Sequence, residues 1–398
     1  MSNKITFNGV EFYQDESDIK WKNSTLPNNI GNHYDDYDKI LVVNSTKAGK
    51  QTDEHAMLKD HYSKLYFKFL NLCNEKCKLI TIEHSGDIQQ IAHTQLLSNG
   101  GKKFLVVILS GDTSIKELIE GADTLDIVLD ILHVPFGTAN ALFWDLFQVD
   151  KNTDIKSENY VSFNDILQRQ FLQFVKGTEL KGKDIPLYTI RSTKTSERVL
   201  AICFLLITTG FHATLLKVAS EPAYATLGDE RFLKASNDLA GDKYHYNNYI
   251  EIINKSNHDD VIFAKQESSY FGIFNQGRLE RGYDISPMSD FTHRYILSIK
   301  EEEGKKQEFF NKILKGYDPD TNALIKMYND DPLVVYKEVD TNVDLLMRIY
   351  PNTKENICFE KNVCIDGHLV PEDDILKDGY LELSIEKIRN NNIKFFGI

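Results

Sequence analysis

The sequence has few cysteines and no long apolar run. Its 398 residues include only five cysteines, an odd number that is thinly spread between Cys73 and Cys364. This spacing argues against a disulfide framework or a zinc motif and predicts reduced thiols. No apolar stretch approaches the roughly 20 residues of a membrane-spanning helix. The longest stretch, Val199–Ile207, has the length of a strand.

Basic residues are outnumbered by acidic ones, which leaves a net charge of −13. This balance argues against non-specific nucleic-acid binding, which needs a basic surface, so we expect no nucleic-acid partner. Hydrophobic residues make up 41% of the chain, enough to bury a core, and the length predicts two domains. The first residues lack the apolar core of a signal peptide, so the expected location is cytoplasmic.

A regular alternation of strands and helices is predicted after residue 38. Apolar runs predict strands at 39–44, 79–82, 104–109 and 126–134, with helical segments at 54–78, 87–97, 113–121 and 139–147. Strands separated by helices predict right-handed crossovers and a doubly wound, mostly parallel sheet that is covered on both faces. In such sheets the functional residues lie in the loops after the carboxyl ends of the strands.

The pattern changes after about residue 150, where most segments are strand-like. Ser162 is a candidate N-cap for a helix at Phe163–Val175, and Val199–Thr208 is expected to form one strand. We therefore predict an N-terminal extension (1–38), an α/β domain (39–150) and a β-rich, sandwich-like domain (151–398). The last residues are candidates to return to the first domain.

Loops rich in small and polar residues follow three of the predicted strands: Asn44–Lys50, Ser110–Ser114 and Pro135–Asn140. Small residues let a phosphate approach the backbone, and helix N-termini supply free N–H groups. Each loop alone is more typical of an ordinary strand–helix turn, but three of them on adjacent strand ends predict a nucleotide site. Neither a Walker A loop nor a G-x-G-x-x-G fingerprint occurs.

These loops resemble motifs of the catalytic domain that diacylglycerol, ceramide and sphingoid long-chain-base kinases share. Ser110–Gly121 resembles their S-G-D-G motif with its following glutamate, and Pro135–Asn140 resembles P-x-G-T-x-N. Later segments resemble further motifs in the family's order: Gly210–Thr214, Leu227–Phe232, Gly282–Pro287 and Val363–His368. The resemblance implies the two-domain architecture of NAD kinases and diacylglycerol kinases. The S-G-D start is closest to the long-chain-base branch.

The resemblance implies an ATP- and Mg²⁺-dependent lipid kinase that phosphorylates a lipid hydroxyl, with a sphingoid base as candidate acceptor. Asp112 and Asp366 are the implied catalytic and metal-binding residues, because phosphoryl transfer needs a carboxylate that orients the hydroxyl and cations that offset phosphate charge. The implied nucleotide-binding residues are Asn44, Thr46, Lys47, Ser110, Gly111, Thr113, Glu117, Gly137, Thr138, Asn140, Arg231 and Gly367. Thr214 and Glu221 are the implied substrate residues. A lipid substrate, peripheral contact with an intracellular membrane and a homodimer are compatible with this assignment.

The sequence also departs from the family pattern. Thr113 and Ala139 replace glycines, and Ser45 replaces a proline. Thr214 and His368 replace acidic residues, which weakens a Mg²⁺ site because this ion prefers oxygen ligands. Two alternatives therefore stay open. One is a catalytically inactive pseudokinase that binds lipid, nucleotide or a protein partner. The other is an NAD-kinase-like enzyme, against which the lack of a clear N-T-D segment counts.

Overall fold

The computed structural model describes residues 4–15, 18–25, 34–84, 86–96, 101–122, 125–147, 161–177, 180–194, 198–225, 227–228, 230–241, 246–352, 361–389 and 391–398. The chain forms two compact units, Met1–Asp184 with Asn392–Ile398 and Ile185–Asn391. The first is an α/β unit with a mainly parallel sheet, and the second is rich in antiparallel strands, so the predicted fold class is confirmed. The units divide after Asp184, whereas the sequence predicts a boundary after residue 150.

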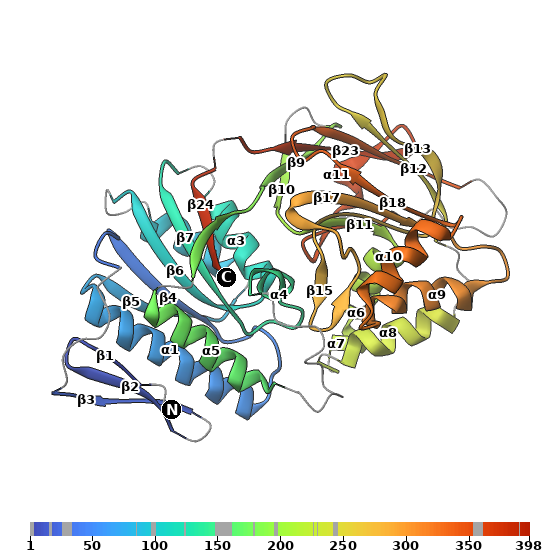
Figure 1. Cartoon of the computed structure of the whole chain (residues 1–398). Helices are drawn as coiled ribbons and strands as arrows, with labels where there is room; N and C mark the ends of the chain where they lie inside the picture. The colour runs from blue at the N-terminus through green and yellow to red at the C-terminus, as the bar shows by residue number, and fades with distance from the viewer. Residues whose placement is uncertain are drawn as a thin grey trace. The chain divides into compact units, whose positions relative to one another are not determined.

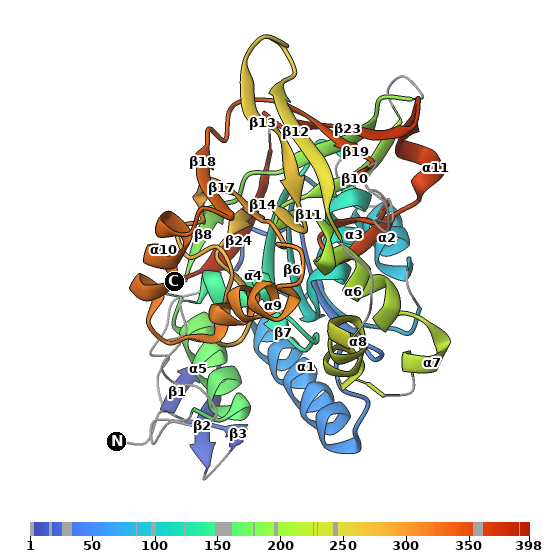
Figure 2. The same cartoon turned by 90° about the vertical axis from the view of Figure 1, so that its right-hand side faces the viewer.

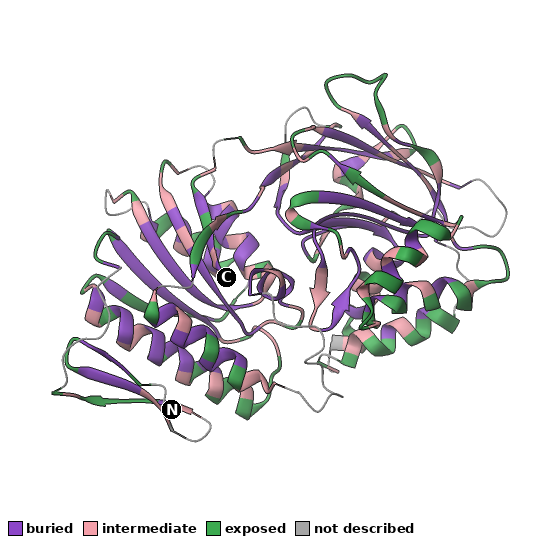
Figure 3. Ribbon diagram, in the orientation of Figure 1, coloured by how far each residue is buried: buried purple, intermediate pink, exposed green. Residues whose placement is uncertain are grey.

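The first unit is built on a six-stranded sheet with the order β5-β4-β6-β7-β24-β8. Its strands are β4 (Lys39–Ser45), β5 (Cys77–Ile82), β6 (Lys103–Ser110), β7 (Val128–Pro135), β8 (Lys181–Asp184) and β24 (Ile393–Gly397). All neighbours pair in parallel except β24 and β8. Strand β4 is buried along its whole length, as a strand covered on both faces requires (Figure 3). The last residues of the chain therefore complete the sheet of the first unit.

Helices cover both faces of this sheet. Helices α1 (Asp53–Cys73) and α5 (Phe163–Lys176) lie together on one face, and α3 (Asp112–Ala122) lies on the other (Figure 1). Shorter helical segments are α2 (Asp87–Ile91), the π-helix η1 (Ala92–Leu96) and α4 (Ala141–Leu146). Helix α5 begins at the predicted cap, where Ser162 and Asp165 form a capping box, and it ends at Gly177 with a φ of 65°.

The N-terminal residues add a small antiparallel sheet to the first unit. It consists of β1 (Lys4–Phe7), β2 (Val10–Asp15) and β3 (Asp18–Asn23). The rings of Phe7 and Phe12 lie 5.4 and 5.8 Å from the ring of Phe69 on α1. The segment predicted as a peripheral extension thus contributes to the apolar packing of the first unit.

The second unit contains two antiparallel sheets around one core. One sheet has the order β10-β9-β23-β19-β12-β13, and the other has the order β18-β17-β14-β11-β20-β21. The first consists of β9 (Tyr188–Ser192), β10 (Val199–Cys203), β12 (Asn248–Asn254), β13 (Val261–Ser268), β19 (Leu345–Tyr350), β22 (Leu376–Lys377) and β23 (Tyr380–Lys387). The second consists of β11 (Leu206–Gly210), β14 (Tyr270–Gln276), β17 (Asp290–Ile299), β18 (Val334–Val339), β20 (Val363–Ile365) and β21 (His368–Val370). Buried residues of both sheets, such as Ile250 and Phe271, share one apolar cluster.

Helices flank these sheets (Figure 2): α6 (Phe211–Ala219), α7 (Pro222–Ala225), α8 (Glu230–Gly241), α9 (Lys306–Leu314), α10 (Thr321–Asp330) and α11 (Glu372–Ile375). A short 3-10 turn, η3 (Lys315–Tyr317), and the strand pair β15 (Arg278–Glu280) and β16 (Tyr283–Asp284) complete the unit. Among the described helices, none combines the length and the hydropathy needed to cross a bilayer.

The long apolar run Val199–Ile207 is not one strand, which corrects the prediction. It turns at Phe204 and Leu205, so that β10 joins one sheet and β11 the other. All residues from Ala201 to Gly210 are buried. A turn inside a core can therefore consist of apolar residues, and neither glycine nor proline marks it in the sequence.

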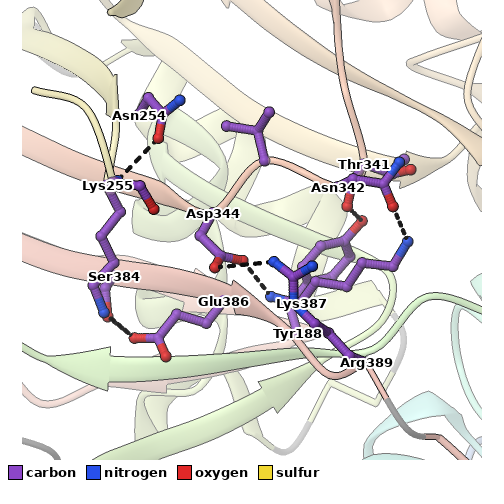
Figure 4. Close-up of polar contacts among 12 residues, drawn as sticks. Tyr188, Asn254, Lys255, Thr341, Asn342, Asp344, Ser384, Glu386, Lys387 and Arg389 are labelled. Atoms are coloured by element: carbon purple, nitrogen blue, oxygen red, sulfur yellow. Dashed lines mark hydrogen bonds and ion pairs between the residues drawn. The ribbon is translucent and has the colours of Figure 1, made fainter. Parts of the chain in front are cut away.

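Polar contacts tie the β18–β19 connection to strands β9 and β23 (Figure 4). The hydroxyl of Tyr188 donates to the carbonyl of Thr341 at 3.4 Å. The ammonium of Lys387 donates to Asn342 at 2.8 Å, and its backbone N–H donates to Asp344 at 2.9 Å. These contacts connect the β18–β19 loop to the sheet that contains β9, β19 and β23.

The cysteines within the described ranges are buried: Cys73, Cys77, Cys203 and Cys364. Burial raises the pKa of the Cys73 and Cys77 thiols to about 12, so neither is a thiolate at neutral pH. Cys358 lies outside the described residues.

Candidate functional site

The three predicted loops meet at one edge of the parallel sheet. Strands β4, β6 and β7 are adjacent and parallel, so their carboxyl ends lie side by side. A Cβ on Gly137 would lie 2.3 Å from the Cα of Gly111, and a Cβ on Gly49 would lie 2.2 Å from the carbonyl oxygen of Phe136. These glycines therefore let the loops touch one another, a role that the sequence analysis did not assign to them.

Asp112 joins the second loop to the third. It is the first residue of α3, and its carboxylate accepts the N–H groups of Ala141 at 2.7 Å and Leu142 at 3.1 Å. Those groups begin α4, where the helix dipole favours negative charge. Burial raises the pKa of the Asp112 carboxyl, while the two N–H bonds act in the opposite direction. Asp112 is thus a carboxylate held at the point where the loops meet.

His133 supports the loop that precedes Asp112. It is fully buried on β7, and its Nε2 lies 3.0 Å from the carbonyl oxygen of Ser110. A carbonyl only accepts, so this nitrogen carries the proton. Burial lowers the pKa of His133, which keeps the ring neutral despite the neighbouring Asp112. The sequence analysis missed His133, whose only signal is a single histidine inside an apolar strand.

Asn140 closes its own loop. Its φ is 56°, and its side chain accepts the N–H of Gly137 at 2.7 Å and donates to the carbonyl of Gly137 at 2.8 Å. The side chain predicted to bind nucleotide therefore shapes the loop that begins α4. Thr138 and Thr113, by contrast, are exposed on the joined loops.

The carboxyl end of β4 carries an unsatisfied acceptor. Asn44 is 8% exposed, and its side-chain oxygen has no hydrogen-bond partner among the described residues. Buried polar atoms are rarely left unpaired, so this oxygen suits a hydrogen-bond donor of a ligand. Both the N–H and the hydroxyl of Thr46 bind the carbonyl of Ile82 at 3.0 Å, whereas Lys47 is exposed.

Lys59 of α1 also holds the residues that follow Asn44, a role that was not predicted from the sequence. Its ammonium donates to the carbonyl oxygens of Ser45, Thr46 and Ala48. Lys59 stands three residues before Tyr62 and seven before Tyr66, both of which are fully buried. A lysine on the buried face of a predicted helix was the available signal.

Glu117 lies one turn further along α3 and binds elsewhere. Its carboxylate accepts the N–H of Gly86, the N-cap residue of α2, at 3.2 Å. Glu117 therefore links α3 to the start of α2.

The remaining predicted site residues belong to the second unit. The Thr214 hydroxyl donates to the carbonyl of Gly210 within α6 at 2.9 Å, and Glu221 is exposed before α7. The guanidinium of Arg231 lies 4.7 Å from the ring centre of Phe232, and its Nε has no partner among the described residues. The Thr214 hydroxyl is therefore engaged within the second unit, whereas the Nε–H of Arg231 remains available as a donor to a ligand.

Asp366 serves the fold of the second unit. It is 2% exposed and begins the Asp-Gly turn between β20 and β21, with a φ of 47° followed by 84° at Gly367. Its carboxylate accepts the N–H groups of Phe204 at 2.8 Å, Leu205 at 3.0 Å and Leu206 at 2.8 Å. Both oxygens are engaged by the turn between β10 and β11. The structure thus places Asp366 in the packing of this turn, and its catalytic and metal-binding role stays a prediction.

The described residues contain no group of three or more histidine, cysteine or acidic side chains that could hold a metal ion. Asp112 is the acidic residue where the loops of the first unit meet. Mg²⁺ is commonly held by one or two carboxylates together with water and substrate phosphates. The site therefore fits a Mg²⁺ ion that arrives with a nucleotide and does not fit a cage made by the protein alone.

Residues 39–169 match the family model of the diacylglycerol kinase catalytic domain. This segment contains all three loops, and the resemblance inferred from the sequence is confirmed for it. Similarity to the long-chain-base branch in particular stays a prediction.

Solved structures resemble the whole chain. A "putative diacylglycerol kinase" from Bacillus anthracis str. Sterne is 16% identical with a TM-score of 0.56, over 91% of this chain and 98% of that one. A structure described as a diacylglycerol kinase from the same strain is 14% identical with a TM-score of 0.51, over 91% and 98% of the two chains. At these identities the likeness concerns the fold. No curated protein matches the sequence.

Proposed function

We propose that the protein is a kinase that transfers the terminal phosphoryl group of ATP to a lipid hydroxyl. The observation that carries this proposal is Asp112, whose carboxylate lies where two strand-end loops join. The match of residues 39–169 to the diacylglycerol kinase catalytic domain supports the same reaction.

Asp112 has the acceptor capacity that the reaction needs. Each of its oxygens accepts one backbone N–H, which leaves a lone pair on each for an acceptor hydroxyl or for water on Mg²⁺. Bound ATP would supply the phosphoryl group. The buried oxygen of Asn44 would accept a hydrogen bond from it, and the exposed Lys47, Thr113 and Thr138 would face its phosphates. These residues suit phosphoryl transfer, in which proteins act by positioning and electrostatics.

Thr214 favours an uncharged lipid acceptor. It stands where the sphingosine-type kinases carry the aspartate that contacts the lipid head group. The Thr214 hydroxyl is bound by Gly210, so no carboxylate at this position pairs with the ammonium of a sphingoid base. We therefore rank diacylglycerol above a sphingoid base as the acceptor.

The test is transfer of label from Mg-ATP to diacylglycerol, monoacylglycerol, ceramide, a sphingoid base and NAD. We expect a labelled diacylglycerol that the Asp112→Asn variant does not form. The matched control is Asp320→Asn, because Asp320 also caps a helix, accepting the N–H groups of Asn322 and Ala323 in the second unit. Labelled NAD alone would overturn the lipid assignment and favour the NAD-kinase-like alternative.

A pseudokinase is the second candidate, and Asp366 is the observation that favours it. Both of its carboxylate oxygens are engaged by backbone N–H groups, so the implied second acidic site residue is not free. Binding of a fluorescent ATP analogue without any labelled product would support this candidate. A labelled lipid that is lost in Asp112→Asn would exclude it.

A further inference from the structure

Lys59 places a positive charge inside the loop that follows β4. Its side chain is 2% exposed, and its Nζ lies 2.6 Å from the carbonyl oxygen of Ser45, 3.1 Å from that of Thr46 and 2.9 Å from that of Ala48. An ammonium has three N–H donors, so these contacts use all of them. No acidic side chain pairs with this ammonium among the described residues.

Burying the Lys59 ammonium raises the free energy of the fold unless its contacts order the loop. Burial of a charge without a counter-ion is unfavourable, and burial lowers the pKa of Lys59 to about 8. In return, the ammonium draws together three carbonyl oxygens that would otherwise repel one another at this turn. An apolar side chain of similar size would fill the volume without ordering the loop.

The loop ordered by Lys59 is the one that touches the rest of the candidate site. It begins directly after Asn44, whose side-chain oxygen is buried without a partner. It ends at Gly49, which lies against the carbonyl of Phe136 in the loop after β7. A shift in the Ser45–Ala48 backbone would therefore move both the unsatisfied acceptor and the contact between the loops.

We infer that Lys59 is a positioning residue, whose ammonium holds residues 45–48 in the conformation that receives the nucleotide. This inference rests on the proposed function, since it names the group that prepares the nucleotide loop. Lys59 acts through backbone carbonyls and does not itself contact the nucleotide.

The experiment compares Lys59→Met, Lys59→Gln and Lys59→Arg with the full-length wild-type protein. Lys39→Met is the matched control, because Lys39 is also buried and its ammonium also binds a backbone carbonyl, that of Gln95, at 3.0 Å. Lys39 begins the same strand, whereas the loop follows its other end. The readouts are amide hydrogen exchange of residues 45–49, the Kd of a fluorescent ATP analogue, and the KM for ATP against kcat.

We expect Lys59→Met to accelerate exchange at residues 45–49 and to raise the Kd and the KM for ATP at least tenfold, with a smaller change in kcat. Lys59→Arg should recover part of the affinity, because it retains a cation with several donors. Lys39→Met should leave exchange at 45–49 and the Kd unchanged. If Lys59→Met does not fold, Lys59→Gln provides the same test with an uncharged donor.

Unchanged exchange at 45–49 in folded Lys59→Met or Lys59→Gln would overturn the inference, and so would an unchanged Kd. Loss of affinity in Lys39→Met equal to that in Lys59→Met would also overturn it, since the effect would then be general destabilisation. A wild-type protein that binds no ATP would instead overturn the proposed function. The exchange measurement would still decide whether Lys59 orders the loop.

Discussion

Asp112 and Asp366 both stand next to a glycine in short acidic motifs, and both bind backbone N–H groups, yet their surroundings differ. Asp112 accepts two N–H groups at the start of a helix beside the edge of a parallel sheet. Asp366 accepts three from a buried turn between two antiparallel sheets and is 2% exposed. The first arrangement leaves lone pairs for a ligand, whereas the second uses the carboxylate to build the fold.

The difference shows what a strand-end loop provides that a hairpin turn does not. A helix N-terminus at the edge of an open sheet stabilises a carboxylate while keeping one side accessible. A turn inside a sandwich surrounds the carboxylate with backbone on all sides. Similar short motifs can therefore leave carboxylate lone pairs open to a ligand in one unit and use them for folding in the other.

The largest expected effect comes from removing the buried carboxylate. Asp366→Ala leaves three N–H groups of the β10–β11 turn without an acceptor and should lower the free energy of unfolding by about 3 kcal/mol or more. Urea denaturation followed by circular dichroism measures this loss. Asp378→Ala is the matched control: Asp378 begins another Asp-Gly turn with a φ of 49° but is exposed, so it should cost much less. Equal losses would show that the turn, not the buried carboxylate, matters.

The complementary change removes the half-buried carboxylate of Asp112. Asp112→Asn should reduce phosphoryl transfer about 100-fold or more, because the amide cannot take a proton from the acceptor hydroxyl. It should lower the free energy of unfolding by only about 1 kcal/mol, the usual cost of weakening a helix cap. Lipid phosphorylation and urea denaturation measure the two effects. A large loss of stability with little loss of activity would place Asp112 in the same structural class as Asp366.

Disrupting the contact between the two loops should have an intermediate effect on the free energy of unfolding. Gly137→Ala places a Cβ 2.3 Å from the Cα of Gly111 and 2.8 Å from the side-chain oxygen of Asn140. The loops must separate, so the free energy of unfolding should fall by about 1–3 kcal/mol. Thermal unfolding tests this, with Gly241→Ala as the control, since a Cβ there meets no atom within 4 Å. A neutral Gly137→Ala would mean that the loops move apart readily.

The smallest expected effect is a pH dependence confined to the first unit. Lys59 is charged below about pH 8 and loses its proton above it, so protection of residues 45–49 and affinity for ATP should weaken between pH 7 and 9. The titratable neighbours one turn away on α1 are His55 and Tyr62. Residues 363–370 of the Asp366 hairpin should keep their protection over the same range. Hydrogen-exchange protection factors measure both segments in one sample.

The free energy of unfolding should change with pH in the opposite direction to the protection of the loop. The two measurements therefore distinguish the order of the loop from the stability of the fold. An unfolded lysine titrates near 10.5, so between about pH 8 and 10.5 the unfolded chain binds more protons at Lys59 than the folded chain. The contribution of Lys59 to the free energy of unfolding therefore rises over that range while the loop loosens. In Lys59→Arg both changes should be absent. A loop that loosens equally in Lys59→Arg would exclude Lys59 as the titrating group.

The edge of the parallel sheet where the three loops meet was predictable from the sequence because it depends on local patterns. Apolar runs without alternation identified β4, β6 and β7, and loops of small and polar residues identified the edge where they meet. The sequence also placed Asp112 at the start of α3. The division of Val199–Gly210 into β10 and β11 was not predicted, because the turn at Phe204 and Leu205 is apolar and contains neither glycine nor proline.

By itself, the sequence determined the alternation of strands and helices in the first unit, the parallel sheet and the three loops at its edge, because periodicity and turn composition are local properties. Only the tertiary structure decided which polar groups are free. It showed that Asn140 binds its own loop, that Asp366 binds a turn some 160 residues earlier, and that Lys59 holds three carbonyls. Such pairings join residues that are separated in sequence, and the energy of a buried charge depends on the partners that the fold brings to it.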